Sequence, residues 1–347
     1  MAITTRRGLL SGIAGCSSAL LTGALAACGR STPDQPAPSP SETPSTGTPS
    51  PTTTPARPSS ATSTPSPTPT PTPDALRPGV VNVLFLGNDS RTDNWSGRPD
   101  VIMVAQLSAD RTDLTVVSIC RDTYVSYSGG GSGKINAAHL HGGTNGLVRT
   151  VSNLLGGIEI HYVAQTGFSG FIAITRWLKG IPVVNRHATS PTVISTGRKV
   201  VFAKGRITIH GTDGLIYARE RKSMPLGDLD RAERHRALMR GMITRLKQHQ
   251  AGDAKAFGPL LTMLLKNTKV SGGITEKNLA GLVPALTQVD EQAMVSLQVP
   301  IARFALVKGE SVNLVNTART RELGAALKAG DVRAYVTKYG EGYAPGS

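Results

Sequence analysis

The stretch that decides the fold reads V-N-V-L-F-L-G-N-D-S-R at residues 81–91. Its first half is an almost continuous apolar run, which is typical of a strand buried on both faces. Similar runs occur at residues 101–107, 114–119 and 295–299. Hydrophobic residues at helical spacing predict helices in the intervening and later segments, at residues 147–155, 168–178, 228–250, 257–267, 275–288 and 317–329. The sequence therefore predicts an α/β fold with a mixed central β-sheet flanked by helices on both faces.

The first 78 residues differ in composition from the rest of the chain. All 15 aromatic residues lie at or after Phe85, and 15 of the 23 prolines lie between Pro33 and Pro78. Residues 29–78 are rich in Pro, Ser and Thr and have no hydrophobic period, so we expect a disordered tether there. We expect residues 79–347 to form one catalytic domain, whose motifs lie within about residues 81–250.

Residues 1–28 have the features of an export signal. Arg6 and Arg7 precede a mildly apolar stretch, as in a twin-arginine signal, although export by the Sec route stays open. The sequence L-A-A-C at residues 25–28 resembles a bacterial lipobox, which implies a lipid on Cys28 and a domain held at the extracytoplasmic face of the cell membrane. The alternative is a single N-terminal transmembrane anchor, since the 20 residues 8–27 can just span a bilayer.

Charge and cysteine content narrow the class of protein. The chain has 38 Lys and Arg against 23 Asp and Glu, a formal net charge of +15. Of these, 33 basic and 20 acidic residues lie from Gly79 onward. Such a charge would suit nucleic acid, but an exported domain rarely meets it, so we expect no nucleic-acid partner. Cys120 is the one cysteine of the domain, which excludes an internal disulfide. At the end of an apolar run, it is expected to be a core residue rather than a nucleophile.

Five clusters of polar and charged residues lie at or near the ends of the predicted strands. They occupy residues 87–91, 98–100, 120–123, 134–138, and 219–222 with 227, 228 and 231. Ligands of α/β sheets bind where strands end and loops begin. Arg and Lys side chains bind phosphate oxygens, and Asp carboxylates hold Mg²⁺. The clusters therefore indicate a phosphate ligand together with a divalent metal ion.

The last cluster permits two geometric inferences. If residues 219–221 are extended, Arg219 and Arg221 point to the same side, because side chains alternate along a strand. In the following helix, Arg231 and His235 share a face with apolar residues and are expected to point inward, where an arginine needs an anionic partner. Three further arginines of this helix are expected to point to solvent: Arg234, Arg236 and Arg240.

Together these motifs resemble those of the LytR-CpsA-Psr family of cell-wall glycopolymer transferases. The matching stretches read V-N-V-L-F-L-G-N-D-S-R, S-I-C-R-D-T-Y-V, K-I-N-A-A-H-L-H-G-G, G-T-D-G-L-I-Y-A-R-E-R-K and G-D-L-D-R-A-E-R-H-R. The resemblance implies transfer of a glycopolymer from undecaprenyl pyrophosphate to a hydroxyl of peptidoglycan, as a phosphodiester. Two positions depart from the family pattern: Cys120 replaces a proline, and His235 stands where a glutamine is common.

The resemblance also implies roles for particular residues. Asp89 and Asp100 would hold Mg²⁺, or Mn²⁺ in its place, and apolar residues between the sheet and the helices would house the prenyl chain. Either Asp89 or Asp122 would deprotonate the acceptor hydroxyl. The implied catalytic residues are Asp89, Arg121, Asp122, Arg219 and Arg221. The implied pyrophosphate-binding residues are Arg91, Arg121, Lys134, Arg219, Arg221, Arg231 and His235.

Two other functions use the same residues. In a polyprenyl-pyrophosphate hydrolase, water would replace the sugar acceptor. In a non-enzymatic lipoprotein, the positive surface would bind prenyl phosphates or acidic wall polymers. The sequence leaves open which glycopolymer, which acceptor hydroxyl and which oligomeric state apply.

Overall fold

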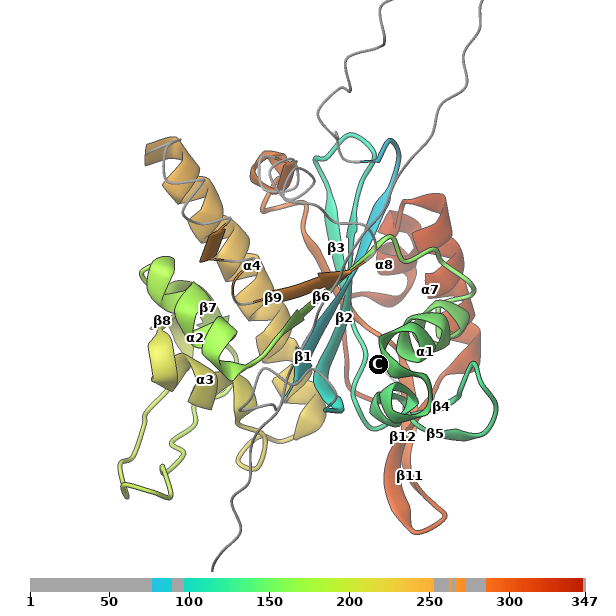
Figure 1. The fold of residues 1–347 in the computed structure, drawn as a ribbon, viewed down its shortest axis with the longest axis horizontal. Helices are drawn as coiled ribbons and strands as arrows, with labels where there is room; N and C mark the ends of the chain where they lie inside the picture. The colour runs from blue at the N-terminus through green and yellow to red at the C-terminus, as the bar shows by residue number, and fades with distance from the viewer. Residues whose placement is uncertain are drawn as a thin grey trace, which may run out of the picture. The chain divides into compact units, whose positions relative to one another are not determined.

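A mixed six-stranded sheet is the centre of the domain (Figure 1). The computed structural model describes residues 77–88, 97–252, 262–263, 266, 268–271 and 285–345, without the side chains of residues 250–252. The strand order is β10-β3-β2-β1-β6-β9. These strands are β1 (Val81–Asn88), β2 (Pro99–Leu107), β3 (Leu114–Ser118), β6 (Tyr162–Thr166), β9 (Thr268–Ser271) and β10 (Val295–Gln298). The strands expected from the apolar runs are therefore confirmed.

Strand direction determines which chain segments meet at the functional edge. Strand β1 is antiparallel to β2 and parallel to β6, while β3 is antiparallel to β2 and parallel to β10. The carboxyl ends of β1, β3, β6 and β10 therefore share one edge of the sheet with the start of β2. This edge carries Asn88, Asp100 and Arg121, as the polar clusters of the sequence predict.

Helices cover both faces of the sheet, as predicted (Figure 1). On one face, alternate strand residues such as Leu84 and Ile102 pack against α1 (Ala138–Leu154), α7 (Thr317–Ala329) and α8 (Arg333–Tyr339). On the other face, Val83 and Met103 pack against α4 (Asp228–Gly252). This alternation follows from the pleat, which points successive side chains to opposite faces.

Helix α4 also joins the sheet to a smaller group of elements. That group comprises α2 (Phe168–Trp177), β7 (Ile181–Asn185), β8 (Gly205–Ile209) and α3 (Gly211–Arg219). Leu238 of α4 packs with Leu178, Ile181 and Tyr217 in a separate apolar cluster. Helix α4 thus lies between two cores, and its first turn begins at the functional edge of the sheet.

The remaining strands form a four-stranded sheet beside this edge. Its order is β11-β12-β4-β5, with β4 (Thr123–Ser126), β5 (Ser132–Lys134), β11 (Ile301–Val307) and β12 (Glu310–Val315). Strand β5 leads through a short 3-10 helix, η1 (Ile135–Ala137), into α1. Since β4 follows directly on Arg121 and Asp122, this sheet places Lys134 near the end of β3.

Several expectations lie outside the described residues. They include the export signal, the lipidation site Cys28, the tether at residues 29–78, and most of the helices expected at 257–267 and 275–288. Residues 285–288 are helical, as expected. Within the part of the chain that is described, no helix has the length and apolar character needed to cross a membrane.

The contact between α4 and β7 predicts the effect of one substitution. A Cβ atom on Gly241 would meet the backbone carbonyl oxygen of Pro182 and the side chain of Ile181. Since backbone cannot move aside cheaply, Gly241→Ala should destabilise the domain by about 1–3 kcal/mol, despite the better helix propensity of alanine. Urea unfolding measures the difference. Gly129→Ala is the control, because open space surrounds Gly129, and its effect should stay within about 0.5 kcal/mol.

Candidate active site

Arg121 is at the centre of the candidate site. Its Nη1 atom donates a hydrogen bond to Asp100 Oδ1 over 2.6 Å. Its Nε atom lies 3.7 Å from Asp122 Oδ2 and 3.9 Å from Asp228 Oδ1. Burial alone would lower the pKa of Arg121, but the bond to Asp100 and the nearby carboxylates outweigh it and raise the pKa. The guanidinium therefore stays charged at the end of β3, with about a fifth of its side chain exposed.

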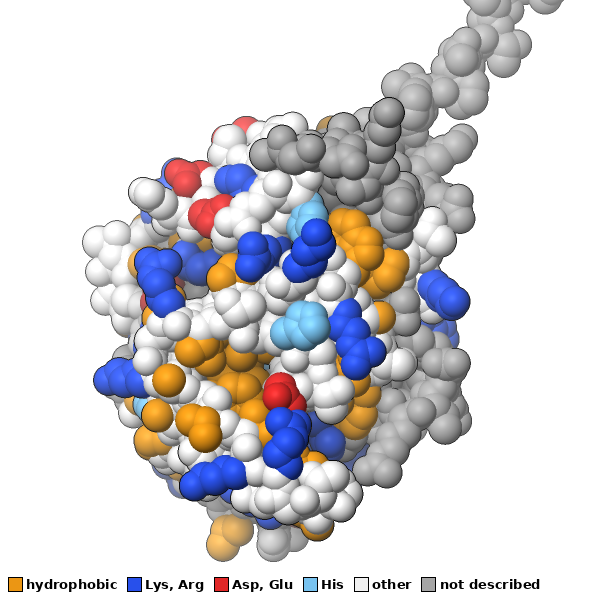
Figure 2. All heavy atoms as spheres, turned by 90° about the vertical axis from the view of Figure 1, so that its left-hand side faces the viewer, with side chains coloured by type: hydrophobic (Ala, Val, Ile, Leu, Met, Phe, Trp, Pro, Cys, Tyr) orange, Lys and Arg blue, Asp and Glu red, His pale blue; other side chains and the backbone are white. Residues whose placement is uncertain are grey.

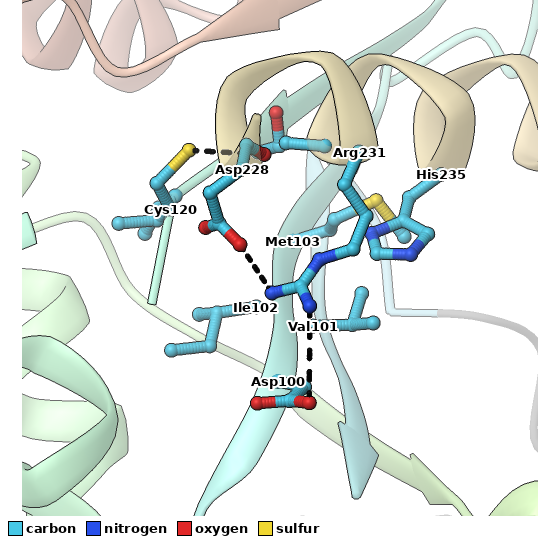
Figure 3. Close-up of a pocket in the computed structure, with 11 residues that line it drawn as sticks. Asp100, Val101, Ile102, Met103, Cys120, Asp228, Arg231 and His235 are labelled. Atoms are coloured by element: carbon cyan, nitrogen blue, oxygen red, sulfur yellow. Dashed lines mark hydrogen bonds and ion pairs between the residues drawn. The ribbon is translucent and has the colours of Figure 1, made fainter. Parts of the chain in front are cut away.

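A second guanidinium, that of Arg231, reaches the same carboxylates from α4 (Figure 3). It forms an ion pair with Asp228, three residues earlier in the helix, and Nη1 lies 4.0 Å from Asp100 Oδ2. The Arg231 side chain is almost fully buried, as its helical position predicts. Burial raises the pKa of Asp228, although Arg231 and Arg121 oppose this effect. Two arginines from different elements thus converge on Asp100 and Asp228.

Lys134 extends the cationic group toward the four-stranded sheet. Its Nζ atom lies 3.1 Å from Asp122 Oδ1 and 3.9 Å from Glu310 Oε2. Asp122 therefore lies between Lys134 and Arg121. Lys134 and Arg121, which the family resemblance implies as pyrophosphate-binding residues, are thus both within reach of Asp122.

His235 lines the same pocket but points its hydrogen-bonding atom elsewhere. The ring is buried, and its Nε2 atom lies 2.8 Å from the carbonyl oxygen of Ala218. Burial, together with the charge of Arg231, lowers the pKa of His235 to about 3. The ring is therefore neutral at ordinary pH, and its Nε2–H donates to Ala218. In this geometry His235 positions the end of α3.

The condition that residues 219–221 are extended is not met. Arg219 is the last residue of α3, and the chain becomes extended only at Glu220. The helix continues to Arg219 because Glu220 still donates a backbone hydrogen bond to Ile216. Because Arg219 lies in a helix, strand alternation does not orient the two arginines. Both are exposed. The Arg219 guanidinium lies 4.4 Å from the centre of the Phe168 ring, and the charge of Arg221 acts on Asp228.

The expectation that Arg234, Arg236 and Arg240 point to solvent was also wrong. Arg234 is 1% and Arg236 3% exposed, and Arg240 is half-buried. Arg234 donates to the carbonyl oxygens of Tyr217 and His187, and Arg236 donates to Ser118 Oγ and Gln298 Oε1. The physical reason is that the first half of α4 is enclosed on several sides. Neutral oxygen acceptors, rather than carboxylates, satisfy most of these buried donors.

Sequence reasoning missed the residues that hold the loop before α4. Buried Asp230 accepts a hydrogen bond from the backbone N–H of Leu226 over 2.7 Å and from the Tyr343 hydroxyl over 2.8 Å. It thereby fixes the turn that links Arg221 to Asp228. The one available signal was its place in the first turn of a helix, where acidic residues bind free N–H groups. Nothing in the sequence pointed to Tyr343, which is 113 residues away.

A small cavity lies beneath the ion pairs (Figure 3). It has a volume of about 10 Å³, close to the space for one water molecule, and Asp100, Cys120, Asp228, Arg231 and His235 are among its lining residues. Cys120 is buried, and burial raises the pKa of its thiol well above the usual value. It is a core residue, as expected, and its burial favours the protonated thiol.

Apolar side chains continue from this cavity along one face of the sheet. Phe85, Val101, Ala164 and Met239 are partly exposed and pack against the core between the sheet and α4. Phe85 is the neighbour of Ala164 across β1 and β6. The charged edge of the site is therefore next to an apolar, partly open surface.

Two predicted site residues, Asp89 and Arg91, lie outside the described residues. Of the predicted metal pair, Asp100 is described, and its carboxylate is about a quarter exposed. Among the described residues, no three His, Cys, Asp or Glu side chains gather as a metal cage. Mg²⁺ is commonly held by one or two carboxylates together with substrate phosphates. The hard oxygen atoms of Asp100 fit that kind of binding.

Comparisons with known proteins find a family model and several relatives that match this chain. A model of the LytR_cpsA_psr family matches residues 52–329, which are more than half of the chain. The polyisoprenyl-teichoic acid–peptidoglycan teichoic acid transferase TagU of Bacillus anthracis is 35% identical over 192 residues. The match covers 55% of this chain and 60% of that relative, which is less than two thirds of its length.

Solved structures share the fold. The crystal structure of TagV from B. subtilis has a TM-score of 0.64 at 23% identity, covering 74% of this chain and 98% of that one. A structure of TagT bound to LI-WTA has a TM-score of 0.58 at 25% identity, covering 73% and 90%.

The low pKa of His235 predicts how stability changes with pH. An unfolded histidine takes up a proton below about pH 6.5, whereas folded His235 does so only near pH 3. Stability from this residue is thus complete above pH 6.5 and is lost as the pH falls toward 3. Between pH 7.5 and pH 5.0, the free energy of unfolding of the wild type should fall by about 2 kcal/mol more than that of His235→Gln. Urea unfolding at both pH values tests this, and equal losses would contradict it.

Proposed function

The chain belongs to the LytR-CpsA-Psr family, and we propose that it transfers a glycopolymer from an undecaprenyl-pyrophosphate carrier to a hydroxyl of peptidoglycan. The observation that carries this proposal is the convergence of Arg121 and Arg231 on Asp100 and Asp228 at one sheet edge. The name of the TagU relatives describes such a transfer of teichoic acid. TagT bound to LI-WTA supports a wall-polymer ligand in this fold.

The ion pairs suit a diphosphate ligand. Arginine binds carboxylate and phosphate through the same paired N–H donors. In this structure Asp100 and Asp228 hold the guanidiniums of Arg121 and Arg231 in place. The basic side chains are therefore oriented before the substrate arrives. Phosphate oxygens then compete with the carboxylates for the same donors. Lys134, which pairs with Asp122, and Arg221, whose charge acts on Asp228, add positive charge beside this pair. Arg219, two residues before Arg221, is proposed to join them.

The reaction follows from where charge develops. The acceptor hydroxyl attacks the phosphorus attached to the glycopolymer, a new P–O bond forms, and undecaprenyl phosphate leaves. Asp89 or Asp122 takes the hydroxyl proton. Arg121 and Arg231 stabilise the negative charge that grows on the leaving phosphate, which is the main contribution a protein makes to phosphoryl transfer.

The lipid chain of the carrier would lie along the apolar surface next to the charged edge. Phe85, Val101 and Met239 offer partly exposed side chains there. Burying a prenyl chain against them contributes about 25 cal/mol for each Å² of apolar surface removed from water. Asp100 is adjacent to Val101, so the headgroup and chain would bind side by side.

A divalent cation belongs to the same proposal. Asp100, with Asp89, would hold Mg²⁺ or Mn²⁺. The ion would neutralise charge on the phosphates.

Export and anchoring complete the proposal. The peptidoglycan acceptor lies outside the cell membrane, and the twin-arginine-like signal would deliver the domain there. A lipid on Cys28, or a single transmembrane anchor, would keep it near the membrane-borne carrier. Teichoic acid, arabinogalactan and capsule are the candidate polymers.

Replacing Arg121 tests the proposed stabilisation of the leaving phosphate by arginine. Arg121→Ala should lower the rate of polymer transfer from a labelled lipid-linked donor to peptidoglycan by about 10²–10³, because one contact to developing charge is lost. Arg333→Ala is the matched control, since Arg333 pairs with Asp113 on the exposed surface, and it should keep the wild-type rate. Equal rates for Arg121→Ala and wild type would contradict the role of Arg121.

The same assay separates transfer from hydrolysis. With peptidoglycan omitted, the donor should stay intact. Release of undecaprenyl phosphate at the same rate without peptidoglycan would instead establish the hydrolase, with water as acceptor. No turnover under either condition, with the donor bound, would establish the binding lipoprotein.

A metal titration tests Asp100. Chelation should abolish transfer, and added Mg²⁺ or Mn²⁺ should restore it. Asp100→Asn should need at least about tenfold more Mg²⁺ for half-maximal activity, since one charged ligand is lost. The control is Asp110→Asn, at the exposed loop on the opposite edge of the sheet, which should titrate like wild type. Activity that resists chelation would contradict the metal proposal.

A further inference from the structure

The hairpin that connects β7 to β8 has an unusual composition. Residues 186–206 contain five Lys or Arg residues and no Asp or Glu. We call this segment the basic arm. Two bridges, Thr189 with Phe202 and Thr192 with Lys199, continue the β7–β8 pairing into it. The basic arm is therefore an ordered two-stranded extension.

The basic arm has one buried and one exposed face. Val200 and Phe202 point inward and pack in the cluster shared with α3 and α4. On the outer face, Val201 is 69% exposed, and Ile194, near the turn, is fully exposed. Val184 of β7, at the base of the arm, is 57% exposed. Among the described residues, none of these three exposed apolar side chains belongs to an apolar cluster.

Most of the positive charge on the arm is available to a partner. Arg186 pairs with Glu233, and Arg198 pairs with Asp213. The other three, Lys199, Lys204 and Arg206, are exposed, and none has an acidic partner among the described residues. Arg206 is the cross-strand neighbour of Val184. The outer face thus alternates basic and apolar groups.

Buried hydrogen bonds hold the base of the arm against α4. Arg234 of α4 donates to Thr189 Oγ1 over 2.9 Å and to the carbonyl oxygen of His187 over 3.0 Å. In Figure 1 the arm extends downward beside α3, in the same direction as the end of β1 and the start of α4. Figure 2 shows the face formed by this group of elements, on which basic side chains surround apolar ones.

We propose that the basic arm docks the domain onto an anionic membrane surface. Lysine and arginine near such a surface gain electrostatic attraction, and apolar side chains gain by entering the headgroup boundary. A soluble polyanion would engage the cations and leave Ile194, Val201 and Val184 in water. The membrane satisfies both kinds of side chain. This contact is distinct from the N-terminal anchor and would orient the site toward the bilayer.

Quenching of an introduced tryptophan tests the proposal in the full chain. Ile194→Trp is mixed with vesicles of phosphatidylglycerol and phosphatidylcholine brominated on the acyl chains. Its fluorescence should be quenched well beyond the background of wild type, which has Trp95 and Trp177. Ala109→Trp is the position control, in the exposed loop between β2 and β3 at the opposite sheet edge, and should show no added quenching. The N-terminal anchor is common to all variants.

Charge reversal supplies a second test. Lys199→Glu with Lys204→Glu and Arg206→Glu, added to Ile194→Trp, should reduce the quenching to background. The matched control reverses three exposed charges on α1 and α7, Arg149→Glu, Arg321→Glu and Lys328→Glu, and should keep the quenching. Circular dichroism checks that both triple variants fold.

Three results would overturn the proposal. One is equal Ile194→Trp fluorescence in brominated and unbrominated vesicles. Another is lysine-dependent binding of soluble polyphosphate without quenching in vesicles, which would show that the basic arm binds polyanions instead. The third is quenching at the same level in purely neutral vesicles, which would overturn the role of anionic lipid.

Discussion

The structure depends on burying the charged start of α4 against the end of the six-stranded sheet. The Arg231 side chain is 6% exposed, and a lone guanidinium at that depth would lose more solvation than packing returns. Asp228, one turn earlier, and Asp100, at the start of β2, supply the missing negative charge. Because these carboxylates come from the helix and the sheet, the same ion pairs join the two elements and arrange the site.

The sheet and its functional edge could be predicted because each signal is local. Apolar runs mark β1, β2 and β3, and polar residues mark the points where the strands leave the core. Asp100 and Arg121 then meet because antiparallel neighbours place the start of one strand beside the end of the next. The prediction needed no knowledge of distant contacts. The family resemblance, rather than a local signal, implied a role for Lys134, and the short β4–β5 hairpin brings this residue to the site.

The remaining parts depend on packing that a helical repeat does not describe. The prediction of solvated arginines assumed one buried face for α4, but Leu229, Leu238 and Ile243 belong to three different apolar clusters. A helix enclosed in this way has no wide solvent face in its first half, so Arg234 and Arg236 must be buried. The same-side orientation of Arg219 and Arg221 was conditional on an extended segment, and the hydrogen bond from Glu220 to Ile216 instead continues α3 to Arg219. Asp230 and Tyr343 meet only through the tertiary fold.

Charge balance explains why the site can be both stable and ready for substrate. Among the described residues, Arg121, Lys134 and Arg231 lie within ion-pair distance of Asp100, Asp122 and Asp228, and Glu310 adds a fourth carboxylate beside Lys134. The carboxylates offset enough repulsion for the cations to remain together in a partly buried place. Removing one of them would leave a basic group without its partner. Phosphate oxygens are acceptors of the same kind as these carboxylates, so a diphosphate can bind the donors that the folded state has already gathered. The acids at this edge therefore stabilise the folded state and hold the basic groups where the ligand needs them.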